Sequence, residues 1–379
     1  MAIYLDHAAT TRVCPPAATA ALHAMTEAYG NPSSRHRLGI DAAMALAEHR
    51  SQIAKTLACQ PEELFFTSGG TEGDNWAIGI ATHINRRVGR HIITTSVEHS
   101  AVLEPIRALE KQGYEVTYLS PDKSGHISIS QLEDALRNDT ILVSMMLVNN
   151  ENGCIFPVRE ASELLRKLES KALLHSDAVQ AFLKIPLSPK ELGVDLLTIS
   201  AHKIGGLKGS GALFVRKGLK TNPLILGGGQ EQGLRSGTEA TPQIAAFAAA
   251  CNLGSNNFAQ HCTQLSDLKS YTLRTLQERI PELVVVSQGD APHICAISLP
   301  GFPSEMLVRS LSDRDIFVSS GSACHKGKPS HVFAAMKLPP KVSMGILRLS
   351  FSPENRKDEI DLLCDALLEI SRTRVAAKT

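Results

Sequence analysis

The feature that most constrains the fold of this chain is a series of short, nearly continuous apolar runs that alternate with helical segments between residues 64 and 216. Runs of this kind are typical of strands buried on both faces, as in parallel sheets covered by helices. The alternation therefore predicts an α/β fold with a mainly parallel, mixed sheet of seven strands sandwiched by helices. The predicted strands are 64–67, 91–96, 114–119, 141–148, 172–177, 194–200 and 211–216, and the predicted helices include 35–59, 100–111, 131–137 and 160–168.

The pattern changes after residue 250. The sequence there predicts a smaller α+β domain with a polar helix at 264–279, strands at 283–287, 294–299 and 315–320, a helix from Ser304 and a last helix from about Asn355 to Arg372. A chain of 379 residues is long enough for two domains. We predict a large domain over residues 15–252 and a small domain made of residues 1–14 and 253–379.

Composition argues against several classes of function. The chain has 39 Lys and Arg against 38 Asp and Glu and no basic run, so direct nucleic-acid binding is disfavoured. It lacks a signal-peptide pattern and any apolar run near the ~20 residues of a membrane span, so we expect a cytoplasmic protein without membrane contact. Its eight cysteines form no CxxC pair, so neither a metal site nor a disulfide framework is predicted.

One cysteine, Cys324, lies in the unusual stretch SSGSACHKGKPSHVF, from Ser319 to Phe333. Small residues precede it and a basic segment broken by glycine follows it. A buried structural cysteine would have apolar neighbours, whereas these serines and glycines are typical of a flexible loop. Taken alone, the stretch leaves open whether Cys324 is a packing residue, a metal ligand or a nucleophile.

Lys203 directly follows the predicted strand 194–200, in the sequence SAHKIGGLKGSG. Open α/β sheets bind their ligands at such strand ends. The run does not match the nucleotide-binding pattern GxxxxGK[ST], because its glycines follow the lysine. A lysine in a partly desolvated pocket can form a Schiff base with a carbonyl compound, and the alternative is a surface lysine on a glycine-rich turn.

Three other strand-to-helix junctions carry the groups that such a lysine needs if its carbonyl partner is pyridoxal phosphate. Asp177 follows a buried strand, where a carboxylate can keep a pyridine nitrogen protonated. The sequence TSGGTE offers the hydroxyls of Ser68 and Thr71 and the N–H groups of a helix start to a phosphate. His99 could stack on a ring or move protons. Each feature alone could be a helix cap or a structural histidine, but their convergence favours a cofactor site.

Together these residues belong to motifs that resemble the cysteine desulfurases of the NifS and IscS type, within the class V aminotransferase group of fold-type I pyridoxal phosphate enzymes. The resemblance extends nearly from end to end. Its motifs, in order, are YLDHAATT (4–11), GNPSS (30–34), FTSGGTEGDN (66–75), EHSAVL (98–103), VNNENG (148–153), HSDAVQ (175–180), SAHKIGG (200–206), RSGTEA (235–240) and SSGSAC (319–324).

The resemblance implies a role for each site residue. Lys203 would bind the cofactor, His99 would stack on its ring and act as acid or base, and Asp177 would pair with the ring nitrogen. Arg348 would bind the substrate carboxylate, because a guanidinium fork fits a carboxylate. The other implied contacts are Gln180 and Asn150 to the phenolic oxygen, Gly70, Thr71, Ser200 and His202 to the phosphate, Thr238 to the phosphate of the partner in a homodimer, and Asn150 and Asn31 to the substrate carboxylate.

The activity implied by the resemblance is removal of sulfur from L-cysteine, with release of L-alanine and storage of the sulfur as a persulfide on Cys324. A sulfur-acceptor protein would then collect it for iron-sulfur cluster assembly or for thiolation of tRNA or a cofactor. The alternatives are a selenocysteine lyase, an ordinary class V aminotransferase, and a catalytically silent partner subunit of a desulfurase.

The segment after Cys324 departs from the family pattern. Only HKGK separates this cysteine from Pro329, a shorter link than in many relatives, and His325, Lys326 and Lys328 stand where relatives have small or neutral residues. One interpretation is that these cations lower the pKa of the Cys324 thiol. The alternative is that they are ordinary solvated charges of a loop. The chain also lacks the longer C-terminal segment of relatives that supply an iron-sulfur scaffold, so general sulfur transfer is implied more strongly than cluster assembly.

Overall fold

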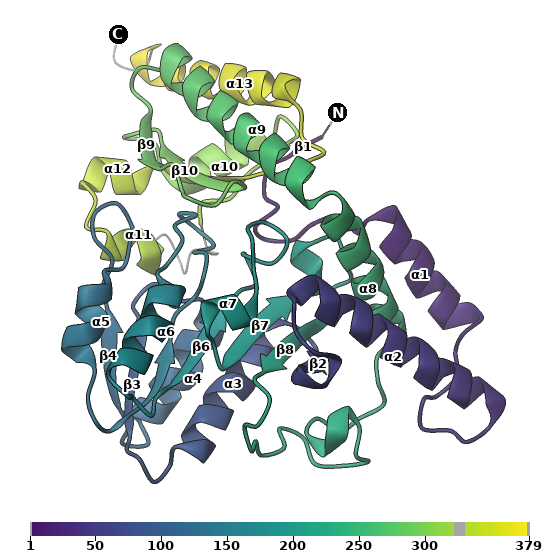
Figure 1. Ribbon diagram of the computed structural model, residues 1–379. Coiled ribbons are helices and arrows are strands. Elements are labelled where there is room, and N and C mark those ends of the chain that lie inside the picture. The colour runs from purple at the N-terminus through teal and green to yellow at the C-terminus, as the bar shows by residue number, and fades with distance from the viewer. Residues whose placement is uncertain (1, 322–329, 377–379) are drawn as a thin grey trace.

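A mixed sheet of seven strands forms the centre of the larger part of the molecule (Figure 1). The computed structural model describes residues 2–321 and 330–376. The strand order is β2-β8-β7-β6-β5-β3-β4, in which β8 runs antiparallel to both of its neighbours and the other pairs are parallel. The predicted seven-stranded mixed sheet is therefore confirmed. Its strands are β2 (Leu64–Thr67), β3 (His91–Thr95), β4 (Glu115–Leu119), β5 (Thr140–Ser144), β6 (Leu173–Asp177), β7 (Leu196–Ser200) and β8 (Gly211–Val215).

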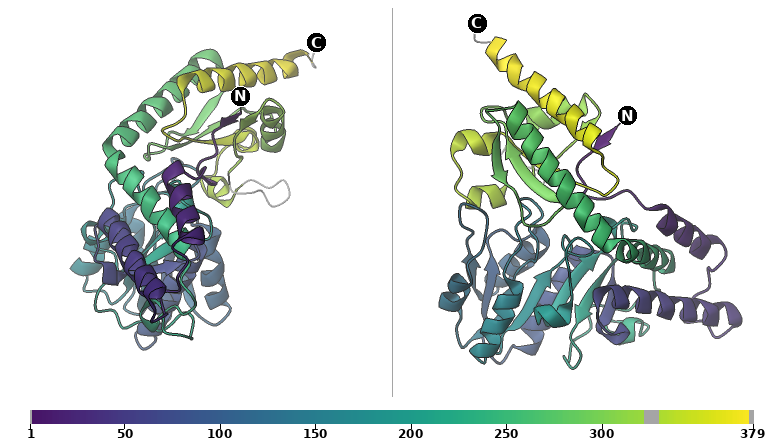
Figure 2. Two further views of the ribbon diagram at one scale, coloured as in Figure 1. Left: turned by 90° about the vertical axis from the view of Figure 1, so that its right-hand side faces the viewer. Right: turned by 45° about the horizontal axis from the view of Figure 1, so that its top comes forward.

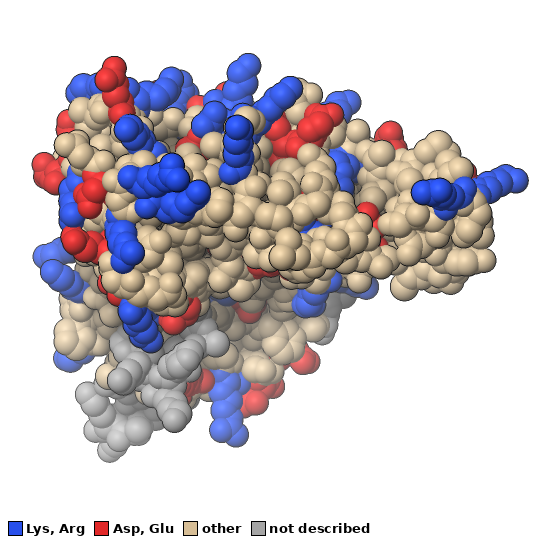
Figure 3. Space-filling view, turned by 90° about the horizontal axis from the view of Figure 1, so that it is seen from below, with Lys and Arg blue, Asp and Glu red and all other residues tan. Residues whose placement is uncertain are grey.

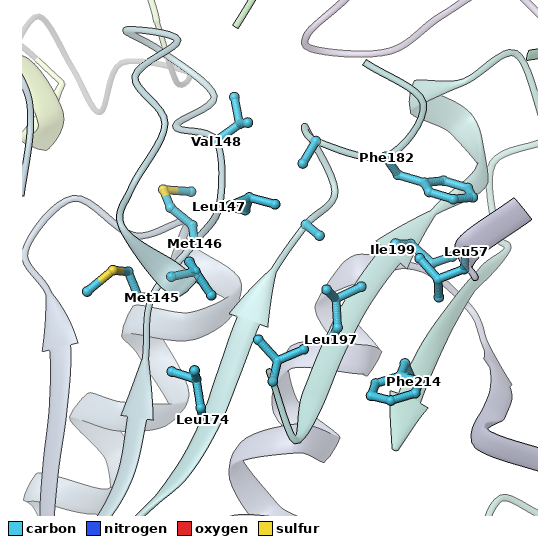
Figure 4. Close-up of a cluster of buried hydrophobic side chains, with 14 of the residues drawn as sticks. Leu57, Met145, Met146, Leu147, Val148, Leu174, Phe182, Leu197, Ile199 and Phe214 are labelled. Atoms are coloured by element: carbon cyan, nitrogen blue, oxygen red, sulfur yellow. The ribbon is translucent and has the colours of Figure 1, made fainter. Parts of the chain in front are cut away.

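Helices cover both faces of this sheet, which explains the continuous apolar runs of its strands. One face packs on α3 (Gly70–Ile84) and α4 (Ser100–Glu110). The other face packs on residues of α2 (Arg37–Leu57), α6 (Val158–Lys167) and α8 (Thr241–Asn256). Figure 4 shows this second cluster, in which Leu174, Leu197, Ile199 and Phe214 line the sheet and Leu57 comes from α2.

The smaller part of the molecule contains an antiparallel sheet in the order β12-β10-β9 and a parallel pair of β1 with β11. Helices α8 and α9 connect it to the larger part (Figures 1 and 2). Its core unites Ile3 and Leu5 with residues between 265 and 370, and on this basis we propose the domain boundaries expected from the sequence. The elements are β1 (Ile3–Tyr4), α9 (Phe258–Arg279), β9 (Val284–Ser287), β10 (Ile294–Ser298), α10 (Ser304–Ser312), β11 (Ile316–Phe317), α11 (His331–Ala335), α12 (Pro340–Met344), β12 (Ile346–Ser350) and α13 (Lys357–Ala376).

Most predicted elements shift by a few residues in the structure, among them two strands and one helix. The strand expected at 141–148 ends at Ser144, because the N–H of Met146 donates to the Glu98 carboxylate, 2.9 Å away, and not to a neighbouring strand. The strand expected at 315–320 is confined to β11, and the helix expected at 264–279 already begins at Phe258.

The remaining helices are short or project from the sheet. Helix α1 (Pro15–Thr26) packs on α8, α5 spans Ile129–Ala135 and α7 spans Pro189–Leu192. Among the helices of the described residues, none combines the length and the apolar character needed to cross a membrane.

Candidate active site

A cavity of about 570 Å³ lies at the carboxyl ends of the parallel strands and is lined by residues of both parts of the molecule. Ligands of open α/β sheets bind at this edge. The cavity brings together most of the residues predicted from the motifs, namely Gly70, Thr71, His99, Asn150, Asp177, Gln180, Ser200, His202, Lys203 and Arg348.

Two of the predicted residues that the structure describes do not line the cavity. Asn31 and Thr238 belong to other parts of the chain surface, and Thr238 is exposed. Cys324 lies outside the described residues, as do His325, Lys326 and Lys328. Ser319, Ser320 and Gly321 do line the cavity, so the chain that leads to Cys324 leaves from its wall.

Lys203 ends a short 3-10 helix (Ala201–Lys203) that directly follows β7. Its Nζ donates to the carbonyl oxygens of Ala8 at 2.6 Å and Ala9 at 2.8 Å. Burial lowers the pKa of Lys203 to about 8, with a further decrease from the Arg348 cation. A neutral amine, which is the form that attacks a carbonyl group, is therefore available close to neutral pH.

Asp177 ends β6, and its carboxylate accepts the N–H of Val179 at 2.9 Å. Burial raises the pKa of Asp177 to about 7, and the Asp74 carboxylate raises it further. His99 is the N-cap of α4, where its Nδ1 accepts the N–H of Ala101 at 3.1 Å. Because burial also lowers the pKa of His99, its ring is neutral and carries its proton on Nε2.

Polar groups without a protein partner gather where α3 begins. The first N–H groups of a helix have no acceptor within it, and Gly70 and Thr71 occupy this first turn. At the end of β7 the buried Oγ of Ser200 has no hydrogen-bond partner in the described part of the chain. His202 contacts Thr10 Oγ1 through Nδ1 at 3.1 Å, and burial lowers the pKa of its ring to about 4. These groups suit an anion.

Arg348 lies in β12 with only 3% of its surface exposed. Its Nη2 donates to Asp6 Oδ1 at 2.6 Å and its Nη1 to the Asn150 carbonyl oxygen at 2.9 Å. Its Nε is buried and finds no acceptor among the described residues. Gln180 donates from Nε2 to the Ala8 carbonyl oxygen at 2.9 Å.

Comparisons with known proteins assign this arrangement to a family. Residues 3–363 match the family described as aminotransferase class-V. Cysteine desulfurase IscS of Clostridium botulinum is 39% identical over 378 residues, which cover 98% of this chain and 95% of that protein. The chain belongs to the cysteine desulfurases of the class V aminotransferase family.

Solved structures agree with this membership. A NifS-like protein superposes with a TM-score of 0.92 at 35% identity and covers 98% of this chain and 99% of its own. The structure of SspA in complex with cysteine has a TM-score of 0.79 at 32% identity and covers 93% of this chain and 100% of its own.

In this cysteine desulfurase family member, several buried residues near the cavity were not predicted from the sequence. His175 contacts Asp74 through Nε2 at 3.5 Å and Ser144 Oγ through Nδ1 at 2.9 Å, directly beside Asp177. Burial lowers the pKa of His175 to about 4 and raises that of Asp74 to about 7. Asp74, His175 and Asp6 all lie within motifs named above, which was the available signal, but their contacts join distant parts of the chain.

Proposed function

We propose that this protein is a cysteine desulfurase, which removes sulfur from L-cysteine, releases L-alanine and holds the sulfur as a persulfide on Cys324. The observation that carries the proposal is the convergence of Lys203, Asp177 and Arg348 on one cavity, from whose wall the segment toward Cys324 departs. The family of the chain and the names of its relatives support the same activity.

The residues of the cavity fit pyridoxal phosphate. The unpartnered Ser200 Oγ and the N–H groups of Gly70 and Thr71, together with His202, would hold its phosphate. Asp177 would hold the ring nitrogen in its protonated form, and a cation in that position would keep the buried carboxyl ionised. His99 would stack on the ring, and Gln180 and Asn150 would contact the phenolic oxygen. When bound, this cofactor supplies an electron sink for the bond that breaks in the substrate.

The side chains of the protein would then act on the substrate. The Arg348 guanidinium, which borders the cavity, would orient the carboxylate of L-cysteine, with Asn150 beside it. The Lys203 amine, neutral above a pH of about 8, would take the α proton. The Cys324 thiolate would attack the substrate sulfur, so that an S–S bond forms as the C–S bond of L-cysteine breaks. The electron pair of the broken bond stays with carbon, which takes up a proton to give L-alanine. Asn31 does not line the cavity of its own chain, so the cavity gives no support to its proposed contact with the substrate carboxylate.

A homodimer would complete the site. Thr238 is exposed on its own subunit and outside the cavity, as a residue that serves a partner's phosphate site would be. Figure 3 shows that the arm formed by α1 and α2, on the right, bears few charges over much of this face. Large apolar side chains are exposed on or beside these helices and would suit burial against a second copy: Leu22, Met25, Tyr29, Leu38, Ile40 and Met44.

The sulfur acceptor, a protein that would serve iron-sulfur assembly or thiolation of tRNA or a cofactor, remains a prediction, as does a cytoplasmic location. No feature of the described residues favours the rival activities over desulfuration.

The test is to incubate the purified protein and its Cys324→Ala variant with L-cysteine and to measure alanine. A desulfurase variant without Cys324 should keep the absorbance of the bound cofactor but lose turnover. An aminotransferase would form no alanine from L-cysteine alone, and with an added keto acid it would transfer the amino group in both forms. A silent partner subunit would lack the cofactor absorbance. Repeating the assay with L-selenocysteine separates a selenocysteine lyase, which would prefer that substrate.

A further inference from the structure

A second cluster of reactive side chains lies away from the cavity, where the two parts of the molecule meet. His126 is in the loop after β4, Cys154 follows β5, and Asp290 is in the loop between β9 and β10. One ligand atom of each lies within 4.8 Å of the others. None of the three lines the large cavity. His126 and Asp290 border an open groove that reaches the cluster from solvent.

The hydrogen bonds around His126 determine which nitrogen of its ring carries the proton. The Asp122 carboxylate accepts the N–H of Ser124 at 2.8 Å, the N–H of His126 at 3.0 Å and the hydroxyl proton of Ser124 at 2.6 Å. A carboxylate that holds three donors acts as the acceptor in each of these hydrogen bonds. Because the Ser124 proton is used, Ser124 Oγ can only accept from His126 Nδ1, 2.9 Å away.

In the neutral ring of His126 the other nitrogen, Nε2, therefore carries a lone pair. This lone pair points at another acceptor. Nε2 lies 2.9 Å from Asp290 Oδ2, which also accepts the N–H of Ile155 at 2.9 Å. Two acceptors at this distance need either a proton or a cation between them. The Cys154 thiol completes the cluster, and its own hydrogen-bond partners are Ser124 O at 3.5 Å and Ser287 Oγ at 3.8 Å.

We propose that His126, Cys154 and Asp290 bind a zinc ion through Nε2, Sγ and a carboxylate oxygen, with water as the fourth ligand. Zinc accepts this mixture of nitrogen, sulfur and oxygen, whereas magnesium and calcium prefer oxygen alone. Zinc bonds of about 2.0 to 2.3 Å require these atoms to be less than about 4 Å apart, so small side-chain rotations suffice.

The surroundings are consistent with this assignment. The contact of His126 Nδ1 with Ser124 and, through it, Asp122 is the kind of support that orients a metal-binding histidine. The ionised thiolate and the Asp290 carboxylate together balance the charge of Zn²⁺. Burial raises the pKa of the Cys154 thiol to about 12, so binding would displace a proton from it.

The site would join the loop that carries Asp290 to the segment that carries Cys154, and so connect the small sheet to the large one. Cys154 follows Asn150, which borders the cavity, in the same turn. Zinc would therefore stabilise the junction beside the cavity without taking part in the reaction. This inference does not depend on the proposed function.

The test is a calorimetric titration of the full-length, cofactor-loaded protein with Zn²⁺ after removal of metal by a chelator. The Cys324→Ala background removes the cysteine that the proposed function makes reactive. We expect one Zn²⁺ per chain and a higher Tm with zinc. The heat of binding should also change with the ionisation enthalpy of the buffer, which shows that protons are released. The variants His126→Gln, Asp290→Asn and Cys154→Ser should each weaken binding at least about tenfold. Co²⁺ should give thiolate-to-metal absorption that Cys154→Ser removes.

Matched controls distinguish this site from adventitious binding. His23→Gln removes an exposed histidine that faces Glu27 at 3.4 Å, and Cys262→Ser removes a half-buried thiol elsewhere. Both should bind zinc as the background does. The His126 and Asp290 variants change partly exposed side chains, so they still test zinc binding if Cys154→Ser fails to fold. Zinc binding that these two variants leave unchanged, or no stoichiometric zinc at all, would overturn the proposal and leave a simple His126–Asp290 ion pair.

Discussion

The chemistry expected of single residues in the cavity depends on their burial. Burial disfavours the charged form of a side chain, so the pKa of Lys203 is lowered and that of Asp177 is raised. The same effect keeps the rings of His99 and His202 neutral. The side chains of the cavity therefore carry fewer charges than they would in water. A charged ligand would change the protonation of several of them together.

The lowered pKa of Lys203 predicts the pH dependence of cofactor attachment. An ordinary lysine becomes neutral near pH 10.5, whereas Lys203 loses its proton near pH 8. Only the neutral amine attacks the aldehyde, so the rate at which cofactor-free protein takes up pyridoxal phosphate should rise with pH and level off above a midpoint near 8. Stopped-flow absorbance measures this rate. A midpoint near 10 would contradict the prediction, and Lys203→Arg should show no attachment.

Arg348 predicts a separation of substrate binding from turnover. Lysine keeps the charge but cannot form the two parallel hydrogen bonds of a guanidinium with a carboxylate. Arg348→Lys should therefore raise KM for L-cysteine roughly tenfold or more, which corresponds to about 1.4 kcal/mol, with a smaller change in kcat.

The control for this change is Arg314→Lys, because Arg314 pairs with Glu369 at the surface, 3.2 Å away. Steady-state assays of alanine formation compare the two variants. An unchanged KM in Arg348→Lys would show that another residue binds the carboxylate.

At the scale of elements, helix α3 depends on one close contact with the sheet. A Cβ atom on Gly73 would lie 2.7 Å from Thr198 Cγ2 of β7. Gly73→Ala should push the start of α3, with Gly70 and Thr71, away from the strand. We expect a loss of about 1–3 kcal/mol in the free energy of unfolding and weaker retention of pyridoxal phosphate.

Gly79 is the matched control on the same helix, because a Cβ atom there meets nothing within 4 Å. Gly79→Ala should leave cofactor retention unchanged and stabilise the protein by up to about 1 kcal/mol. Chemical denaturation and cofactor titration measure both quantities. Equal losses in the two variants would refute the role given to the Gly73 contact.

The elements themselves were largely predictable from the sequence, and so was their meeting place. Asp177 and Lys203 each follow a run of apolar residues, and the ends of parallel strands share one edge of a sheet. Strand ends were harder to predict where a side chain, and not a neighbouring strand, accepts a backbone hydrogen bond. The Glu98 carboxylate accepts the N–H of Met146 in this way, and no local pattern in the sequence predicts this hydrogen bond.

At the scale of the whole molecule, the contacts that join its two parts could not be predicted from local patterns. Arg348 meets the carbonyl oxygen of Asn150, Lys203 meets the carbonyl oxygen of Ala8, and His126 meets Asp290, in each case across more than a hundred positions of the chain. Motifs predicted which residues border the cavity but not how these side chains pair before a ligand binds.

The proposed homodimer can be tested by mixing two inactive subunits. A chain with Lys203→Ala cannot attach the cofactor, and a chain with Thr238→Ala should retain phosphate weakly in the partner's site. A mixed dimer would pair the native Lys203 of one chain with the native Thr238 of the other, so mixing should restore activity. Its level should approach one native site per dimer. No recovery, in subunits shown to exchange, would contradict the sharing of Thr238.

In the proposed reaction Cys324 receives the sulfur of L-cysteine. The most direct measurement is the mass of the peptide that contains Cys324 after brief incubation with L-cysteine, with alanine measured in the same sample. We expect one added sulfur atom on this peptide, removed by a reducing thiol, and one alanine for each sulfur bound in the first turnover. Alanine formed while the Cys324 peptide stays unmodified would contradict it.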